Sequence, residues 1–209
     1  AMYDTGKKEW KSFENWPPKQ AKKVNYYLRA DGGLSPINTR QIATTEYFSD
    51  PTKPVPSSEN RKEMNGFTPR NYMSEDQRFT ENRPDVATFT TDILTEDLTI
   101  SGEILAKLRI ATTGTDADFF VKLIDIYPAD EKANPDKPNV LLANYHQMVR
   151  SEIMPARFRN SFEKPEALVP NQETEVKVQL QDVLHTFKKG HRMQIQIQST
   201  AFPLFAINP

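Results

Sequence analysis

Residues 98–110, LTISGEILAKLRI, decide the fold class because apolar and polar side chains alternate along nearly their whole length. Leu98, Ile100, Ile104 and Leu108 fall on one side of an extended chain, whereas Lys107 falls on the other. Side chains of a β-strand point alternately to opposite faces. The stretch therefore predicts a long strand with one buried face and one solvated face.

Other stretches extend this pattern. Residues 176–181 and 192–198 also alternate, and residues 119–127, FFVKLIDIY, are apolar on both faces except at Lys122 and Asp125. A run of this second kind predicts a central strand that is covered on both sides. Further strand candidates are residues 24–28, 41–48, 86–89 and 140–149. About eight strands, without a long helix-period segment, predict an all-β jelly-roll β-sandwich similar to galactose-binding domains.

Two stretches do not have strand periodicity. Residues 1–23 contain Trp10 and Trp16, followed by Pro17 and Pro18, and are predicted to form an irregular arm ahead of a sandwich domain at residues 24–209. Residues 50–84 form a long irregular connection. Connections of this length are usually functional or packed on a partner, although a flexible surface loop is the alternative.

Composition excludes several classes of protein. The 209 residues carry a formal net charge of -1 and no cysteine, so neither a basic nucleic-acid surface nor thiol chemistry is expected. No apolar run reaches the roughly 18–20 residues that span a bilayer. The polar N-terminus does not resemble a signal peptide, and Ala1 and Met2 are interpreted as a cloning remnant.

Residues typical of hydrolytic catalysis do not form a recognisable constellation. A serine nucleophile is usually presented within Gly-x-Ser-x-Gly, and this motif does not occur in the sequence. The nearest match includes Ser35, which is followed by Pro36 and fits a plain turn. His191 precedes a predicted strand and is expected to be a packed or hydrogen-bonded turn residue rather than a general base. The sequence therefore predicts no catalytic residue in this chain.

Two polar clusters have a binding interpretation and a structural one. Asp116 and Asp118 lie in a turn between two predicted strands, where paired carboxylates either bind calcium or close the turn by accepting backbone hydrogen bonds. Two carboxylates are too few to make calcium specific, so no metal site is predicted. Gln194, Gln196 and Gln198 share one strand face, which is expected to be solvated or docked to another domain, with sugar binding as the alternative.

Several motifs then occur in an order that is similar to one family. They are residues 83–86 (RPDV), 94–98 (LTEDL), 114–119 (GTDADF), 121–128 (VKLIDIYP), 187–192 (FKKGHR) and 198–204 (QSTAFPL). Together with the two tryptophans of the arm, they resemble the C-terminal non-catalytic domain of the X-Pro dipeptidyl-peptidase and cocaine-esterase superfamily. Residues 75–79, EDQRF, resemble in particular the α-amino-acid ester hydrolases, relatives of glutaryl-7-aminocephalosporanic-acid acylase.

The resemblance implies a parent serine hydrolase with an α/β-hydrolase domain, a helical cap and a jelly roll. The catalytic triad belongs to the first two parts, so none of its residues is expected here, and no cofactor is implied. The implied role is to buttress the hydrolase domain and to wall its active-site cleft. The arm would be the junction with that domain, and the final segment of the family's jelly roll is expected to be missing after Pro209. The resemblance further implies a periplasmic or secreted parent that can form homo-oligomers. Neither nucleic-acid nor membrane partners are expected.

Met64 and Phe67, in the long connection, match by position an apolar contributor to the acyl pocket of cocaine-esterase relatives. They are predicted to lie at the rim of the substrate cleft, with loop anchoring or interdomain packing as the alternative. A free-standing carbohydrate-binding or oligomerisation module is the competing interpretation of the whole chain.

Overall fold

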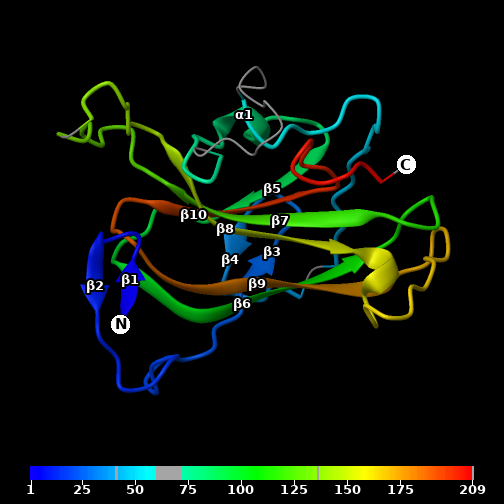
Figure 1. Cartoon of the computed structure of the whole chain (residues 1–209), viewed down its shortest axis with the longest axis horizontal. Helices are drawn as coiled ribbons and strands as arrows, with labels where there is room; N and C mark the ends of the chain where they lie inside the picture. The colour runs from blue at the N-terminus through cyan, green and yellow to red at the C-terminus, as the bar shows by residue number, and fades with distance from the viewer. Residues whose placement is uncertain (41, 60–71, 136, 209) are drawn as a thin grey trace.

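The computed structural model describes residues 1–40, 42–59, 72–135 and 137–208 and has two β-layers (Figure 1). One layer is a four-stranded sheet in the order β5-β10-β7-β8, and the other is the long pair β6-β9. All pairings within these two sheets are antiparallel. The strands of the sandwich are β5 (Val86–Thr90), β6 (Leu98–Ile110), β7 (Asp118–Ile126), β8 (His146–Pro155), β9 (Thr174–Phe187) and β10 (Arg192–Gln198).

The core lies between the layers because the apolar side of each strand faces inward. β6 and β9 contribute residues such as Leu108 and Val178, and β7 and β10 contribute residues such as Val121 and Ile197, all of them buried in one cluster. Burial of apolar area on this scale is the main favourable contribution to folding. The prediction of an all-β sandwich is confirmed, and so is the central, doubly covered position of residues 119–127.

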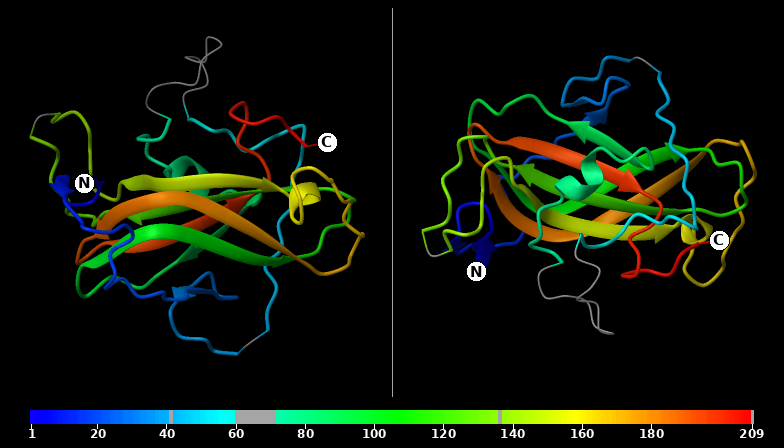
Figure 2. Two further views of the ribbon diagram at one scale, coloured as in Figure 1. Left: turned by 60° about the horizontal axis from the view of Figure 1, so that its bottom comes forward. Right: turned by 90° about the horizontal axis from the view of Figure 1, so that it is seen from above.

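Short elements complete the fold. They are β1 (Met2–Asp4) and β2 (Glu9–Lys11), which form a hairpin; β3 (Tyr27–Leu28) and β4 (Leu34–Ser35), which form a second; helix α1 (Arg78–Glu81); and the 3-10 turn η2 (Ala156–Phe158). The second hairpin lies beside β5, where Thr90 N bonds to Gly32 O at 2.8 Å, whereas α1 lies over the outer face of the four-stranded sheet (Figure 2). None of the helices in the described residues has the length and hydrophobicity to cross a bilayer.

Three predicted strands differ from the structure. Of residues 24–28 only Tyr27 and Leu28 pair, and the described residues 42–48 form no strand. Residues 140–145 are turn and coil, and the strand predicted there begins at His146 and continues to Pro155. Asn144 has a positive φ of 53° and its N–H bonds to Pro128 O, so the chain turns at this point and extends only afterwards.

The long strand pair contains a bulge against which the arm packs. The β6-β9 register shifts between Gly102 and Ile104, and Gly102 has a φ of 90°. A Cβ at Gly102 would lie 2.9 Å from Pro17 Cγ, so a glycine is required both by the backbone and by the arm.

Candidate functional site

The outer face of the four-stranded sheet is covered by segments without regular strands. Residues 47–59, 72–84 and 199–208 lie over this face, and we call them the cover (Figures 1 and 2). The cover is held by backbone bonds such as Ser57 N to Phe202 O at 2.8 Å and Gln77 N to His146 O at 3.0 Å. The cover contains most of the irregular connection that the sequence singled out as functional.

The glutamine row of β10 lies beneath the cover, and the expectation of a solvated face was wrong. Gln194, Gln196 and Gln198 are fully buried. Gln194 Nε2 donates to Glu81 Oε1 at 3.1 Å, Gln196 Nε2 donates to Gln194 Oε1 at 3.0 Å, and Thr80 Oγ1 donates to Gln196 Oε1 at 2.8 Å. Helix α1, more than a hundred residues earlier in the sequence, supplies partners for Gln194 and Gln196, whereas Gln198 Nε2 donates to Thr200 O at 2.6 Å. The face is covered by a segment of this same domain, an arrangement that none of the alternatives raised from the sequence described.

Lys122 of β7 is part of the same network. Its side chain projects to the outer face and the residue is 2% exposed. Lys122 Nζ donates to Gln77 Oε1 at 3.1 Å and to Thr80 Oγ1 at 3.3 Å, and it lies 5.6 Å from the centroid of the Phe79 ring. Burial lowers the pKa of Lys122 to about 7, with opposition from the charge of Glu75.

Unsatisfied polar atoms of the described residues concentrate at this interface between cover and sheet. Buried side-chain atoms without a hydrogen-bond partner are Ser57 Oγ, Ser58 Oγ, Glu75 Oε2, His146 Nδ1 and Gln198 Oε1. Burial lowers the pKa of His146, although the nearby carboxylates of Glu81 and Asp76 oppose this. A buried polar atom that lacks a partner costs roughly 1–3 kcal/mol. The cover is therefore the least completely satisfied part of the described structure.

Large apolar side chains are also exposed on the cover. Phe48 is 79% exposed, and Phe202 and Met73 are partly exposed. The two segments that carry Phe48 and Phe202 are joined by the bond of Tyr47 Oη with Ser199 Oγ at 2.9 Å and by that of Phe202 N to Val55 O at 2.9 Å. Exposed apolar groups beside unsatisfied polar atoms are typical of a surface that binds a partner.

The predicted cleft-rim residues Met64 and Phe67 lie outside the described residues, so their placement stays a prediction. The described residues on either side of them belong to the cover. The cover therefore borders the segment to which the cleft-rim prediction applies.

The three histidines are packed structural residues. His191 Nδ1 lies 2.7 Å from Asp125 Oδ1, and His185 Nε2 lies 3.1 Å from Asp125 Oδ2. His185 and His191 are buried between the layers, and His185 Nδ1 also meets Thr5 Oγ1 of the arm at 2.7 Å. His191 is hydrogen bonded, as the sequence predicted. His146, discussed above, lies on the other side of the sheet.

Arg157 forms ion pairs with the carboxylates of Asp116 and Asp118. Arg157 Nη1 lies 2.5 Å from Asp116 Oδ2 and 3.7 Å from Asp118 Oδ1, and Asp116 Oδ1 accepts the Ala117 N–H at 2.9 Å. Burial raises the pKa of Asp116, but the bonds from Arg157 and Asn208 outweigh it and lower the pKa overall. Within residues 1–40, 42–59, 72–135 and 137–208, no cluster of three or more metal-ligating side chains occurs. Asp116 closes the turn as the structural interpretation predicted, whereas Asp118 Oδ1 accepts a bond from Asn208 Nδ2 at 3.0 Å.

The N-terminal arm is fastened to the sandwich through Asp4. This residue is fully buried, and its carboxylate accepts bonds from Thr186 N at 3.0 Å, Thr186 Oγ1 at 2.6 Å and Lys11 Nζ at 2.8 Å. Trp10 is 72% exposed and packs against Tyr3 at the surface of the hairpin. The arm is therefore a docked part of the domain that presents an aromatic pair to its surroundings.

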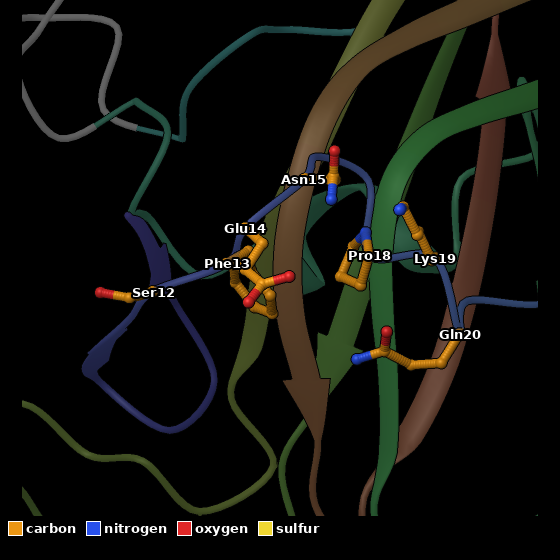
Figure 3. Close-up of a pocket in the computed structure, with 7 residues that line it drawn as sticks. All are labelled: Ser12, Phe13, Glu14, Asn15, Pro18, Lys19 and Gln20. Carbon is orange, nitrogen blue, oxygen red and sulfur yellow. The ribbon is translucent and has the colours of Figure 1, made fainter.

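A shallow hollow of about 230 Å³ lies on the arm (Figure 3). Its lining comes entirely from residues 12–20 and mixes charged and apolar groups, including Phe13, Glu14 and Lys19. Trp16, at the same turn, donates from Nε1 to Asp182 Oδ2 at 2.6 Å and packs against Phe13. The hollow is a feature of how the arm folds against β9, and it is separate from the cover.

Comparison with known proteins assigns the family. All of residues 1–209 match the family described as the X-Pro dipeptidyl-peptidase C-terminal non-catalytic domain. The chain belongs to this family. The X-Pro dipeptidyl-peptidase C-terminal domain occurs in esterase-type and peptidase-type hydrolases, which confirms the resemblance read from the sequence motifs.

The relatives are longer proteins. The domain is 36% identical to an aminopeptidase from the marine sediment archaeon Thaumarchaeota archaeon, with a TM-score of 0.89, covering 99% of this chain and 34% of that one. It is also 36% identical to an α-amino acid ester hydrolase, with a TM-score of 0.85 and the same coverage. Cocaine esterase from Rhodococcus sp. (strain MB1 Bresler) is 27% identical over 222 residues, covering 99% of this chain and 35% of the esterase. The chain thus spans about a third of the length of each relative.

Sequence reasoning missed the buried network of Lys122, Gln77, Thr80 and the β10 glutamines. One signal was present, because Lys122 interrupts an otherwise apolar run in a strand predicted to be covered on both sides. A lysine in such a place needs acceptors from a covering segment. The sequence did not indicate which segment supplies them.

Proposed function

We propose that this X-Pro dipeptidyl-peptidase C-terminal domain packs against the α/β-hydrolase domain of a serine hydrolase of acyl-esterase, dipeptidyl-peptidase or acylase type. In this role it supports the catalytic domain and walls one side of its active-site cleft. The observation that carries the proposal is the full-length match to a non-catalytic domain that makes up about a third of its relatives. A wall of this kind contributes substrate binding and water exclusion rather than bond chemistry.

The cover is the docking surface in this proposal. Phe48 and Phe202 supply apolar area for a partner, and the unsatisfied oxygens of Ser57 and Ser58 supply hydrogen-bonding capacity next to it. By contrast, the part of the outer β6-β9 face that the arm leaves uncovered is polar and exposed, and Leu105 is its exposed large apolar side chain. Met64 and Phe67 remain the proposed residues of the cleft rim, since the cover flanks them.

Residues 1–23 are the proposed junction with the hydrolase domain, and residues 24–209 are the sandwich. The buried Asp4 and the Trp16–Asp182 bond tie this arm to β9, so a domain attached through it would be held in a defined orientation. The Tyr3–Trp10 pair lies on the same arm and adds exposed aromatic area near the junction.

The proposal is tested by a matched pair of substitutions in the longer polypeptide that contains the hydrolase domain. Phe48→Ser should raise KM or lower the melting temperature of the hydrolase domain, because it removes apolar contact at the docking surface. Leu105→Ser removes a comparable exposed side chain from the other sheet and should leave both unchanged. Equal effects of the two variants would count against docking through the cover.

A further inference from the structure

The amine of Lys122 is enclosed between the sheet and the cover with a fixed set of partners. Two oxygen acceptors reach it, Gln77 Oε1 and Thr80 Oγ1, and both belong to residues 72–84 of the cover. The remaining directions face aromatic rings, with the centroids of Phe79 and Phe120 at 5.6 and 5.9 Å. None of the ion pairs among the described residues includes Lys122.

Counting hydrogen bonds distinguishes the two protonation states of this amine. A neutral amine has two N–H donors, and these match the two oxygens. An ammonium group has three donors, so one N–H of the charged form would face an aromatic ring instead of an oxygen. The rings offset part of this loss by a cation–π interaction. A buried charge without an ion-pair partner is nevertheless costly. The neutral amine is therefore favoured while the cover is seated, that is, while residues 72–84 are packed on the sheet.

Charged groups on every neighbouring element bear on this balance. Glu75 and Asp76 precede α1 on the cover, Arg78 and Glu81 lie on α1, and His146 lies on β8. Glu75 acts on Lys122 directly and favours the charged form, but burial is the larger effect. The nearest acids therefore moderate the preference for the neutral amine without reversing it.

We propose that Lys122 is neutral when the cover is seated, and that its protonation releases residues 72–84 from the sheet. Release would let the amine reach water and would break the bonds to Gln77 and Thr80. Seating of the cover then depends on pH near neutrality. This last step rests on the proposed function: if the cover is the docking surface, the affinity for the hydrolase domain also depends on pH.

The expected size of the effect follows from linkage. With a pKa of about 7 when the cover is seated and the ordinary 10.5 when Lys122 is exposed, the opening equilibrium grows as pH falls. Between about pH 8.5 and about pH 6 the predicted increase is about 30-fold.

Amide hydrogen exchange of the isolated domain tests this proposal, with protection factors corrected for the intrinsic pH dependence of exchange. Protection of residues 72–84 should fall about 30-fold from pH 8.5 to pH 6 in the wild type, and should be independent of pH in Lys122→Met. Lys107→Met, at an exposed lysine of β6, should behave like the wild type. An unchanged protection in the wild type, or a pH dependence that persists in Lys122→Met, would overturn the proposal and, in the second case, indicate His146.

A direct titration of the Lys122 side chain by NMR in the wild-type domain does not require a variant that folds. A midpoint near 7 is expected, whereas a midpoint near the ordinary value of 10.5 would refute a neutral lysine. Neither experiment involves the hydrolase domain. A failure of the proposed function would therefore leave both results standing, and a failure here would leave the docking proposal intact.

Discussion

Replacing Asp4 by alanine should detach the N-terminal hairpin from β9 and destabilise the domain. The Asp4 carboxylate is fully buried and accepts bonds from Gly6 N, Lys7 N, Thr186 N, Thr186 Oγ1 and Lys11 Nζ. The N–H groups of Thr186 and Gly6 are buried and would lose their acceptor, whereas the Thr186 hydroxyl keeps Thr99 Oγ1 as a partner at 2.8 Å. Asp4, close to the N-terminus, thus joins the hairpin to β9, which lies far away in the sequence.

The magnitude follows from the donors that are left unpaired. Each buried donor without a partner costs about 1–3 kcal/mol, so the N–H groups of Thr186 and Gly6 suggest a loss of about 2–6 kcal/mol in the free energy of unfolding. The pair with Lys11 adds little, because that lysine is partly exposed and screened. If the hairpin detaches as a unit, the measured loss is limited to the free energy that docks it.

The contribution of Asp4 also depends on pH in a defined direction. Burial alone would raise the pKa of Asp4, but the bonds from Lys11, Thr186 and Lys7 outweigh it and hold the pKa well below its usual range. A folded-state pKa below the unfolded value of about 3.9 means that the carboxylate stabilises the fold fully above that value. The contribution is lost progressively as pH falls below it.

Urea denaturation of the wild type, Asp4→Ala and Asp92→Ala measures both effects, since Asp92 is an exposed control. The difference between the wild type and Asp4→Ala should be several kcal/mol at neutral pH and smaller at about pH 3. A loss of less than about 1 kcal/mol at neutral pH, similar to that of the control, would show that the Asp4 carboxylate does not fasten the hairpin to β9.

Two further predictions concern the domain on its own. The purified domain should turn over neither a p-nitrophenyl ester nor an Ala-Pro chromogenic peptide, because the sequence contains no Gly-x-Ser-x-Gly motif; turnover that co-purifies with the domain through independent columns would contradict this. Gly102→Ala should destabilise the domain by about 1–3 kcal/mol, because φ is 90° and the new Cβ would meet Pro17. Thermal melting checks the second prediction, and an unchanged or higher melting temperature would be inconsistent with the packing of the arm at the bulge.

The sandwich could be predicted from the sequence because the hydrophobic pattern that specifies each strand lies within that strand. The alternation of residues 98–110 fixes which side of β6 is buried, and the apolar run of residues 119–127 fixes the central place of β7. The strand predicted at residues 41–48 failed although its residues favour strands. Tyr47 is held there by a side-chain bond to Ser199, and residues 42–48 have no strand partner. Strand propensity without an available edge does not make a strand.

The cover could not be predicted because it depends on contacts between distant residues. Alternation alone identifies Gln194, Gln196 and Gln198 as the polar face of β10, and a polar face is usually solvated. Burial of that face depends on Thr80 and Glu81, which follow a long irregular stretch and carry no periodic signal. The motif resemblance, in contrast, indicated the family correctly, since it depended on the order of short matches along the chain.

We propose that the domain packs through its cover against a hydrolase domain. Hydrogen exchange of the isolated domain, compared with that of a longer polypeptide containing the hydrolase domain, measures this packing. We expect slower exchange in residues 47–59, 72–84 and 199–208 of the longer polypeptide, with β6 and the outer face of β9 unchanged. Identical exchange throughout the domain in both samples, or protection confined to the β6-β9 face, would contradict it.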